Sequence, residues 1–430
     1  MSITRRSFLL GLGAASLIPN LGWATNSGDY KALVCLVLQG GNDGFNMLIP
    51  TNNQHHEIYR SSRKSISIEK STILPTKLKA VDRYGDEVSL GLHPSMGEIA
   101  ELCNKEHLHA IVNCGVLKMP MSKEDINLAP NMLFSHSSQT EEWNKGNAVA
   151  HETSGWANRL FKHISINNTI LPPLFSFNGQ SSLLAGSQKY NALSPSNSAT
   201  MDFTLDSLRQ EFANGLNSKP KTELHKHFRN MMRDSLYASK ESKDIFSYSD
   251  IDTLNNPSNP LSIQLNSVMK FIRAREYLGQ NRQVFMVKVG GYDTHSNQLS
   301  DHSALLKKLS QSLGAFYNSL ESYGLNSEVT TVTMSEFGRR IVPNATGTDH
   351  GWGNNQLVIN GGLARSGTTG TWPSLKVGGQ DDFQSGHILP TTSVDQIGAT
   401  LAQWMGVAPA DIDKVFPNIG SFSPQLLDFI

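Results

Sequence analysis

Three acidic residues are placed where their carboxylates could share a divalent cation. Asp43, Asp293 and Glu336 each follow a run of apolar residues and lie in a polar or glycine-rich turn. The carboxyl ends of parallel strands meet at one edge of a sheet, so acids far apart in the sequence would lie close together there. Clustered carboxylates repel one another and lose hydration when buried, and a divalent cation relieves both costs. The pattern therefore predicts a metal site.

Two histidines in polar loops extend the predicted set of ligands. His295 lies two residues after Asp293, and His350 directly follows Asp349. Carboxylate oxygen together with imidazole nitrogen suits Zn²⁺, Mn²⁺ or a mixed pair of ions. Zn²⁺ is the first choice, and Mn²⁺, Mg²⁺ and Ca²⁺ are alternatives.

Each of these residues also has a purely structural interpretation. An Asp after a strand is more often a turn former or a helix cap than a ligand, and Asp43 in Asn-Asp-Gly fits that role. Arg339 and Arg340 fit a solvated helix face as well as a cation beside an anion site. The repeated order of strand and then acid is what favours one shared site over a set of unrelated turns.

A doubly wound, mostly parallel α/β sheet would position these residues. Continuous apolar runs predict buried strands over 32–38, 109–114, 284–289 and 329–334, and a short strand over 357–359. Apolar residues at helical spacing predict helices over 96–103, 305–320 and 394–405, and a further helix that begins near Ser138. Strand, helix and strand in this order are typical of a parallel sheet.

The middle of the chain has a different character. Residues 166–260 are rich in Ser, Asn and Pro, with amphipathic pieces near 205–216 and 225–237. This composition predicts a helical, loop-rich insertion or cap on the α/β domain.

The amino terminus reads as an export signal of the twin-arginine kind. Arg5 and Arg6 precede a short apolar run over 8–18, and Gly22-Trp23-Ala24 suits peptidase cleavage. The run is too short to span a bilayer stably, which needs about 20 apolar residues. We therefore expect a signal peptide over 1–24, a single mature domain over 25–430 and a periplasmic or secreted bacterial protein. We expect contact with the twin-arginine translocase during export and no stable membrane anchor.

Charge and cysteine content limit the possible partners. The chain has 37 basic and 37 acidic residues, and removal of 1–24 leaves 35 basic against 37 acidic residues, a net charge of −2. This balance gives no electrostatic case for nucleic acid. Three cysteines, Cys35, Cys103 and Cys114, permit at most one disulfide. The oligomeric state is left open.

The motifs at these positions resemble those of the DUF1501 family, a set of mostly uncharacterised, twin-arginine-exported bacterial proteins. The resemblance covers nearly the whole mature chain in the expected order. The motifs that carry it are Gln39–Gly44, Ser135-His136, Gly290–His295, Ser335–Arg339 and Gly347–Gly353.

The family in turn resembles the alkaline phosphatase and sulfatase superfamily, in which a doubly wound sheet holds two metal ions at its strand ends. The resemblance implies the metal ligands Asp43, Asp293, His295, Glu336 and His350, with Asp349 beside His350 as its orienting partner. One departure is Phe337, which stands where the superfamily places a histidine ligand.

The same resemblance places a nucleophile at the start of the helix near Ser138. Ser135 is the first choice, with Ser137 and Ser138 as alternatives. Arg339 or His136 would stabilise charge on the transferred group.

Three functions follow as expectations. The first is an exported, metal-dependent hydrolase of a small anionic phosphate or sulfate ester. The second is a non-catalytic periplasmic binding or assembly protein that keeps a structural metal on the same fold. The third is a hydrolase of an exported polymer, with residues 166–260 as the specificity cap. The sequence does not identify a substrate.

Overall fold

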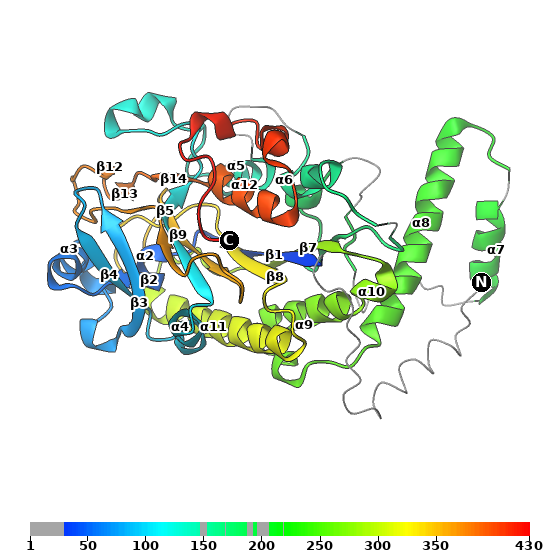
Figure 1. The fold of residues 1–430 in the computed structure, drawn as a ribbon, viewed down its shortest axis with the longest axis horizontal. Coiled ribbons are helices and arrows are strands. Elements are labelled where there is room, and N and C mark those ends of the chain that lie inside the picture. The colour runs from blue at the N-terminus through cyan, green and yellow to red at the C-terminus, as the bar shows by residue number, and fades with distance from the viewer. Residues whose placement is uncertain (1–29, 147–152, 168, 187–191, 196–205, 218) are drawn as a thin grey trace. The chain divides into compact units, whose positions relative to one another are not determined.

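The apolar runs predicted as strands form the centre of one sheet (Figure 1). The computed structural model describes residues 30–146, 153–167, 169–186, 192–195, 206–217 and 219–430 of the 430-residue chain. The predicted strands appear as β1 (Lys31–Leu38), β5 (Leu108–Gly115), β7 (Arg282–Val289) and β8 (Val329–Met334). All residues of β5 and β8 are buried, as expected for strands covered on both faces.

The order of the central sheet is β10-β5-β9-β8-β1-β7-β6, with β14 beside β5. The remaining strands are β6 (Leu174–Ser176), β9 (Asn354–Ile359), β10 (Gly367–Thr369) and β14 (Thr392–Ser393). Strand β9 is antiparallel to both β5 and β8, whereas the other pairs in this sheet are parallel. The prediction of a mostly parallel α/β sheet is therefore confirmed.

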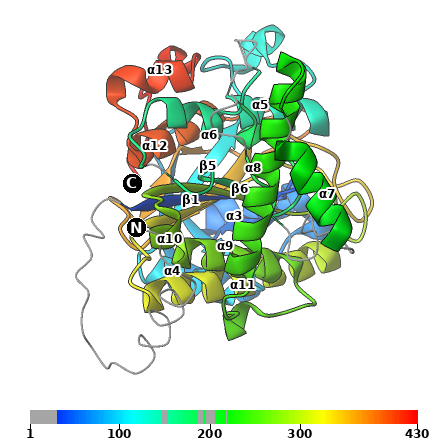
Figure 2. The ribbon, with the colours of Figure 1, turned by 90° about the vertical axis from the view of Figure 1, so that its right-hand side faces the viewer.

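Helices cover the two faces of this sheet, and both views show the two layers (Figures 1 and 2). One face carries α4 (Gly97–Asn104), α9 (Pro260–Arg273) and α11 (Gln298–Ser322). The other carries α5 (His136–Lys145), α6 (Trp156–Arg159) and α12 (Val394–Met405). The predicted leucine stripe of α11 is buried at Leu306, Leu309 and Leu313.

A second, smaller sheet was not expected from the sequence. Its order is β11-β3-β4-β2, with β2 (Leu48–Pro50), β3 (Leu74–Asp82), β4 (Glu87–Leu92) and β11 (Thr371–Trp372). A two-stranded hairpin joins β12 (Asp382–Gln384) to β13 (His387–Ile388). Helix α2 (Gly44–Met47) connects β1 of the central sheet to β2, and α3 (Asn53–Arg63) follows β2 and precedes β3 within the smaller sheet.

The predicted insertion contains two helices near the expected positions, α7 (Asp206–Asn217) and α8 (Glu223–Phe246). Its first part also supplies β6, which pairs in parallel with β7. This part of the predicted cap is therefore built into the edge of the central sheet.

Two further predictions concern the membrane and the cysteines. The signal peptide over 1–24 lies outside the described residues. Across the part of the chain that the structure describes, no helix has the length and apolarity needed to cross a bilayer. Cys35, Cys103 and Cys114 are all buried and unpaired.

Candidate functional site

The carboxyl ends of β7, β1 and β8 bring three loops to the same edge of the central sheet. β1 lies between β7 and β8 and is parallel to both, with Leu38 opposite Val289 and Val37 opposite Met334. The loops that follow hold the predicted acids. Because all three strands run in the same direction, the loops face one crevice.

His136, Asp293 and His350 meet in this crevice. Each offers one ligand atom, and these three atoms lie within 4.8 Å of one another. Nε2 of His350 lies 3.1 Å from Oδ1 of Asp293, and Nε2 of His136 lies 3.6 Å from Oδ2 of Asp293. Two imidazoles and one carboxylate form a donor set that suits Zn²⁺ and related ions.

The proton on His350 is fixed by a backbone carbonyl. Nδ1 of His350 lies 2.9 Å from the carbonyl oxygen of Phe134, which can only accept, so Nδ1 carries the hydrogen. Burial lowers the pKa of His350, although the Phe134 carbonyl opposes this effect. Neutral His350 therefore directs the lone pair of Nε2 towards Asp293.

Asp293 meets that lone pair with a carboxylate. Burial raises its pKa, but the hydrogen bond and charge of Arg339, with smaller contributions from His295 and His350, bring the pKa below its usual value. Asp293 is thus ionised near neutral pH, and two acceptors face each other at 3.1 Å. A proton or a cation between the two atoms would stabilise this pair, and two imidazoles with one carboxylate are a set of ligands that a divalent metal accepts.

His295 lies beside the cluster and links two carboxylates. Its Nε2 is 3.0 Å from Oδ1 of Asp293, and its Nδ1 is 3.3 Å from Oδ1 of Asp349. Asp349 also contacts Arg340 at 3.2 Å. The resemblance paired Asp349 with His350, whereas the structure places its carboxylate against His295 and gives His350 the Phe134 carbonyl as its partner.

Glu336 stands behind His136. Its carboxylate accepts hydrogen bonds from the backbone N–H groups of Gly40 at 3.0 Å and Gly41 at 3.1 Å, and lies 3.7 Å from Nδ1 of His136. Gly40 and Gly41 have φ of +117° and +83°, which turns both N–H groups towards the carboxylate. This placement gives Glu336 the position of a residue that orients His136.

Phe337 closes one side of the cluster with an apolar ring. Its ring centroid lies 4.4 Å from that of His350 and 4.9 Å from that of His136. A Cβ on Gly41 would lie 2.4 Å from this ring, so the glycine is required for the close packing.

Asp43 is not brought into the cluster of His136, Asp293 and His350. Its carboxylate pairs with the guanidinium of Arg63 and accepts from the amide of Gln298, and both side chains of the ion pair are fully buried. Asp43 also caps α2, because the N–H of Asn46 donates to its Oδ1 at 3.2 Å. The contacts of Asp43 therefore fit the structural interpretation, in which an Asp in an Asn-Asp-Gly turn caps a helix.

Arg339 is buried behind Asp293 rather than exposed in the crevice. It donates to Oδ1 of Asp293 at 2.7 Å and to the hydroxyl of Thr348 at 3.1 Å. Burial lowers its pKa, and Asp293 opposes the shift. Arg339 is thus placed to hold Asp293 in position.

Ser135 is the N-cap residue immediately before α5. Its hydroxyl lies 3.1 Å from that of Ser137, and it caps the helix by accepting from the N–H of Ser138 at 3.5 Å. The cap positions His136 in the first turn, with its ring in the crevice.

Sequence reasoning missed the partners that hold the site. Arg63 lies in a polar helix twenty positions after Asp43, and the Phe134 carbonyl is a backbone group. Neither carries a side-chain pattern that points to this crevice. Phe337 was visible only as a departure from the superfamily pattern.

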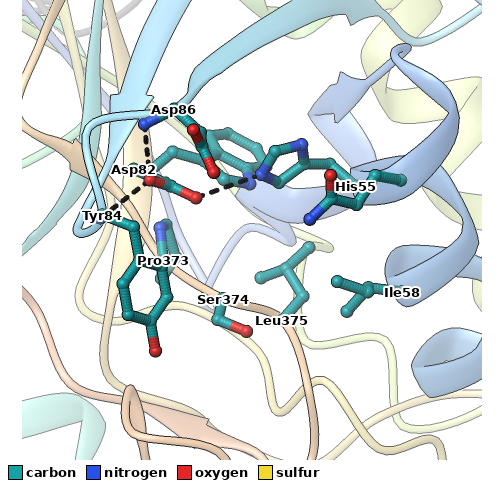
Figure 3. Close-up of a pocket in the computed structure, with 10 residues that line it drawn as sticks. His55, Ile58, Asp82, Tyr84, Asp86, Pro373, Ser374 and Leu375 are labelled. Atoms are coloured by element: carbon teal, nitrogen blue, oxygen red, sulfur yellow. Dashed lines mark hydrogen bonds and ion pairs between the residues drawn. The ribbon is translucent and has the colours of Figure 1, made fainter.

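A separate cavity of about 80 Å³ has none of these residues in its lining (Figure 3). Nε2 of His55 lies 3.2 Å from Asp82, whose other carboxylate oxygen accepts from the N–H groups of Tyr84 at 2.8 Å and Asp86 at 3.0 Å. Asp82 thus secures the turn between β3 and β4 and joins it to α3. These contacts have a structural explanation.

The sheet and the cluster define an α/β protein with a candidate metal centre at the ends of parallel strands. The sequence matches the family model described as "Protein of unknown function (DUF1501)" over residues 30–411. The chain belongs to the DUF1501 family. No curated protein matches the sequence.

Solved structures show only distant likenesses. The C-terminal periplasmic domain of EcEptC from Escherichia coli, in complex with Zn, is 9% identical, with 91% of this chain and 87% of that chain covered and a TM-score of 0.36. The lipoteichoic acid synthase LtaP from Listeria monocytogenes is 8% identical, with 91% and 76% covered and a TM-score of 0.33. The PsFucS1 sulfatase from Pseudoalteromonas sp. is 11% identical, with 91% and 74% covered and a TM-score of 0.33. We draw no functional conclusion from likeness at this level.

Proposed function

We propose that this protein is an exported hydrolase of phosphate or sulfate esters that depends on a divalent metal, with Zn²⁺ as the first choice. The observation that supports it is the meeting of His136, Asp293 and His350, whose three ligand atoms lie within 4.8 Å of one another. The lone pair on Nε2 of neutral His350 faces Oδ1 of ionised Asp293. A cation or a proton between the two atoms would stabilise this contact.

The chain's own residues would hold and orient this centre. His136, Asp293 and His350 are the proposed ligands, with His295 at the open side, while Glu336 and Arg339 hold His136 and Asp293 in place. A bound cation would neutralise the nonbridging oxygens of the ester and lower the pKa of a nearby water. Because the Ser135 hydroxyl is engaged by Ser137 and the helix cap, water is the favoured nucleophile.

Export is part of the proposal. The twin-arginine pattern at Arg5 and Arg6, with Gly22-Trp23-Ala24 as a cleavage motif, supports delivery of the folded protein to the periplasm or beyond. That route suits a site loaded with metal before export.

A second candidate is a binding or assembly protein that holds metal without turnover. The observation that favours it is the surroundings of Asp43 and Phe337. The Asp43 carboxylate is neutralised by Arg63, and the Phe337 ring occupies a side of the cluster with no donor atom. Both features reduce the number of ligands available for a second ion.

A turnover assay separates the two candidates. Mature protein would be stripped of metal, reloaded with Zn²⁺ or Mn²⁺, and assayed on phosphomonoesters, phosphodiesters and sulfate esters. The proposal predicts turnover that needs the added metal and is lost in Asp293→Asn, while Asp301→Asn on exposed α11 surface retains it. Stoichiometric metal with no turnover on any ester would contradict the hydrolase and support the binding protein.

A further inference from the structure

The long helix α8 carries a heptad pattern along one face. Its members alternate at spacings of four and three residues, which keeps them on one side of a helix. They are Leu224, Phe228, Met231, Ser235, Ala238, Ser242 and Ile245.

The two halves of this face differ in burial. Ala238, Ser242 and Ile245 are 8%, 6% and 1% exposed. Leu224, Phe228 and Met231 continue the same face and are 80%, 54% and 56% exposed. We call these three residues the exposed α8 face. The heptad pattern is thus buried in the C-terminal half of α8 and continues, exposed, into the N-terminal half.

Helix α7 lies beside α8 (Figures 1 and 2). The guanidinium of Arg233 donates to the side-chain oxygen of Asn217 of α7 at 2.7 Å. Arg233 lies nine residues after Leu224, and this spacing places the two side chains on opposite sides of the helix. α7 therefore contacts the side opposite the exposed α8 face.

The α7–α8 turn and the first half of α8 carry a net positive charge. Between residues 219 and 234 there are five basic residues and two acidic residues, although the whole chain is balanced at 37 of each. The basic residues are Lys219, Lys221, Lys226, Arg229 and Arg233. Lys219 and Lys221 are exposed in the turn that joins α7 to α8, next to Leu224.

We propose that the exposed α8 face docks on an anionic lipid surface. Large apolar side chains on one side of a helix, with Lys and Arg on its polar side and in the adjoining turn, suit insertion at the boundary between headgroups and acyl chains. The local positive charge is complementary to anionic headgroups. It also disfavours a second copy as the occupant, because self-association would bring two positive regions together. This contact would attach the protein to the surface of the bilayer without spanning it. The proposal does not depend on the proposed hydrolase activity.

A vesicle experiment with the full mature protein tests the proposal. Co-flotation is measured with phosphatidylcholine vesicles, with and without phosphatidylglycerol, at low and high salt. We expect binding to the anionic vesicles that weakens with salt, and little binding to neutral ones. Leu224→Ser/Phe228→Ser should reduce binding by at least about tenfold, whereas Ile263→Ser, an exposed position on α9, should not.

A charge variant adds a second readout. Lys219→Glu/Lys221→Glu should reduce binding by at least about tenfold, and Lys105→Glu at an exposed site after α4 should leave it unchanged. Binding of wild type that is absent, or that ignores lipid charge and the variants, overturns the proposal. Concentration-dependent dimers that Leu224→Ser/Phe228→Ser abolishes would instead assign the face to a second copy and also overturn it.

Discussion

At the scale of single residues, the site is defined by which acid lies beside imidazole nitrogens. Asp293 receives one guanidinium from Arg339 and faces three imidazoles, from His136, His295 and His350. Asp43 forms a fully buried ion pair with Arg63. Both acids have an arginine partner, but only Asp293 also lies beside imidazole nitrogens that could complete a set of metal ligands, so Asp293 and not Asp43 is the carboxylate that a cation would bind.

The buried ion pair gives a prediction about stability. Asp43→Asn leaves the fully buried Arg63 without its counter-charge, so we expect a loss of roughly 3–5 kcal/mol in the free energy of unfolding. Urea denaturation measures it. Metal affinity, measured under conditions where the variant is folded, should stay within a few-fold of wild type. A selective loss of metal with unchanged stability would show that Asp43 is a ligand.

The placement of Asp293 and His350 together could be predicted from the sequence, while their partners could not. The order of strand and then acid brings residues from the ends of parallel strands together, and it does so for Asp293 and Glu336. The same rule placed Asp43 in the right loop but could not reveal Arg63 at its carboxylate. The family resemblance gave His136 a role in stabilising charge on the transferred group and did not identify it as a ligand.

At the scale of elements, α5 positions His136, and the N-cap of α5 stabilises the turn that holds this residue. Ser135→Ala removes the cap, so we expect a loss of about 1 kcal/mol in stability. Ser135→Asn keeps an N-cap side chain without a hydroxyl and should restore stability. Chemical denaturation and turnover are measured together.

The same pair of variants identifies the nucleophile. If water attacks the ester, both variants keep substantial turnover. Loss of turnover in Ser135→Asn with stability restored would assign the attack to the Ser135 hydroxyl, as the family resemblance first implied. Ser137→Ala tests the alternative nucleophile in the same turn, and it too should keep turnover if water attacks.

Elements with continuous apolar runs were predictable, and those with mixed patterns were not. β1, β5, β7 and β8 are buried throughout or nearly so, which leaves an apolar signature without polar interruption. β3 alternates with exposed residues such as Lys77 and Lys79, and β11 has only two residues. Their pairing depends on segments far apart in the chain, which local pattern does not encode.

At the scale of the whole molecule, a buried acid that is not among the candidate site residues sets a pH dependence of stability. Burial raises the pKa of Asp395 to about 7, with a hydrogen bond from Asn418 opposing the shift. The unfolded chain titrates near 3.8, so between these values the native state binds more protons than the unfolded state. Stability contributed by Asp395 is therefore lost as the pH rises from about 4 to about 7.

Asp395→Asn should remove this loss. Wild type should lose on the order of 2–4 kcal/mol more than the variant between about pH 5 and about pH 8, measured by urea denaturation at both values. Asp413→Asn, at an exposed position near the C-terminus, is the matched control. An equal loss in wild type and Asp395→Asn would contradict the assignment.

The central claim is that His136, Asp293 and His350 bind one divalent cation between the ends of β1, β7 and β8. The most direct measurement is the metal content of mature protein purified from periplasm, with Zn²⁺ titration of the stripped form. We predict stoichiometric metal in wild type and in His227→Ala, an exposed control on α8, and at least about a 100-fold weaker affinity in folded His350→Ala and Asp293→Asn. Wild-type protein that binds no metal, or variants that bind it as tightly as wild type, would contradict the claim.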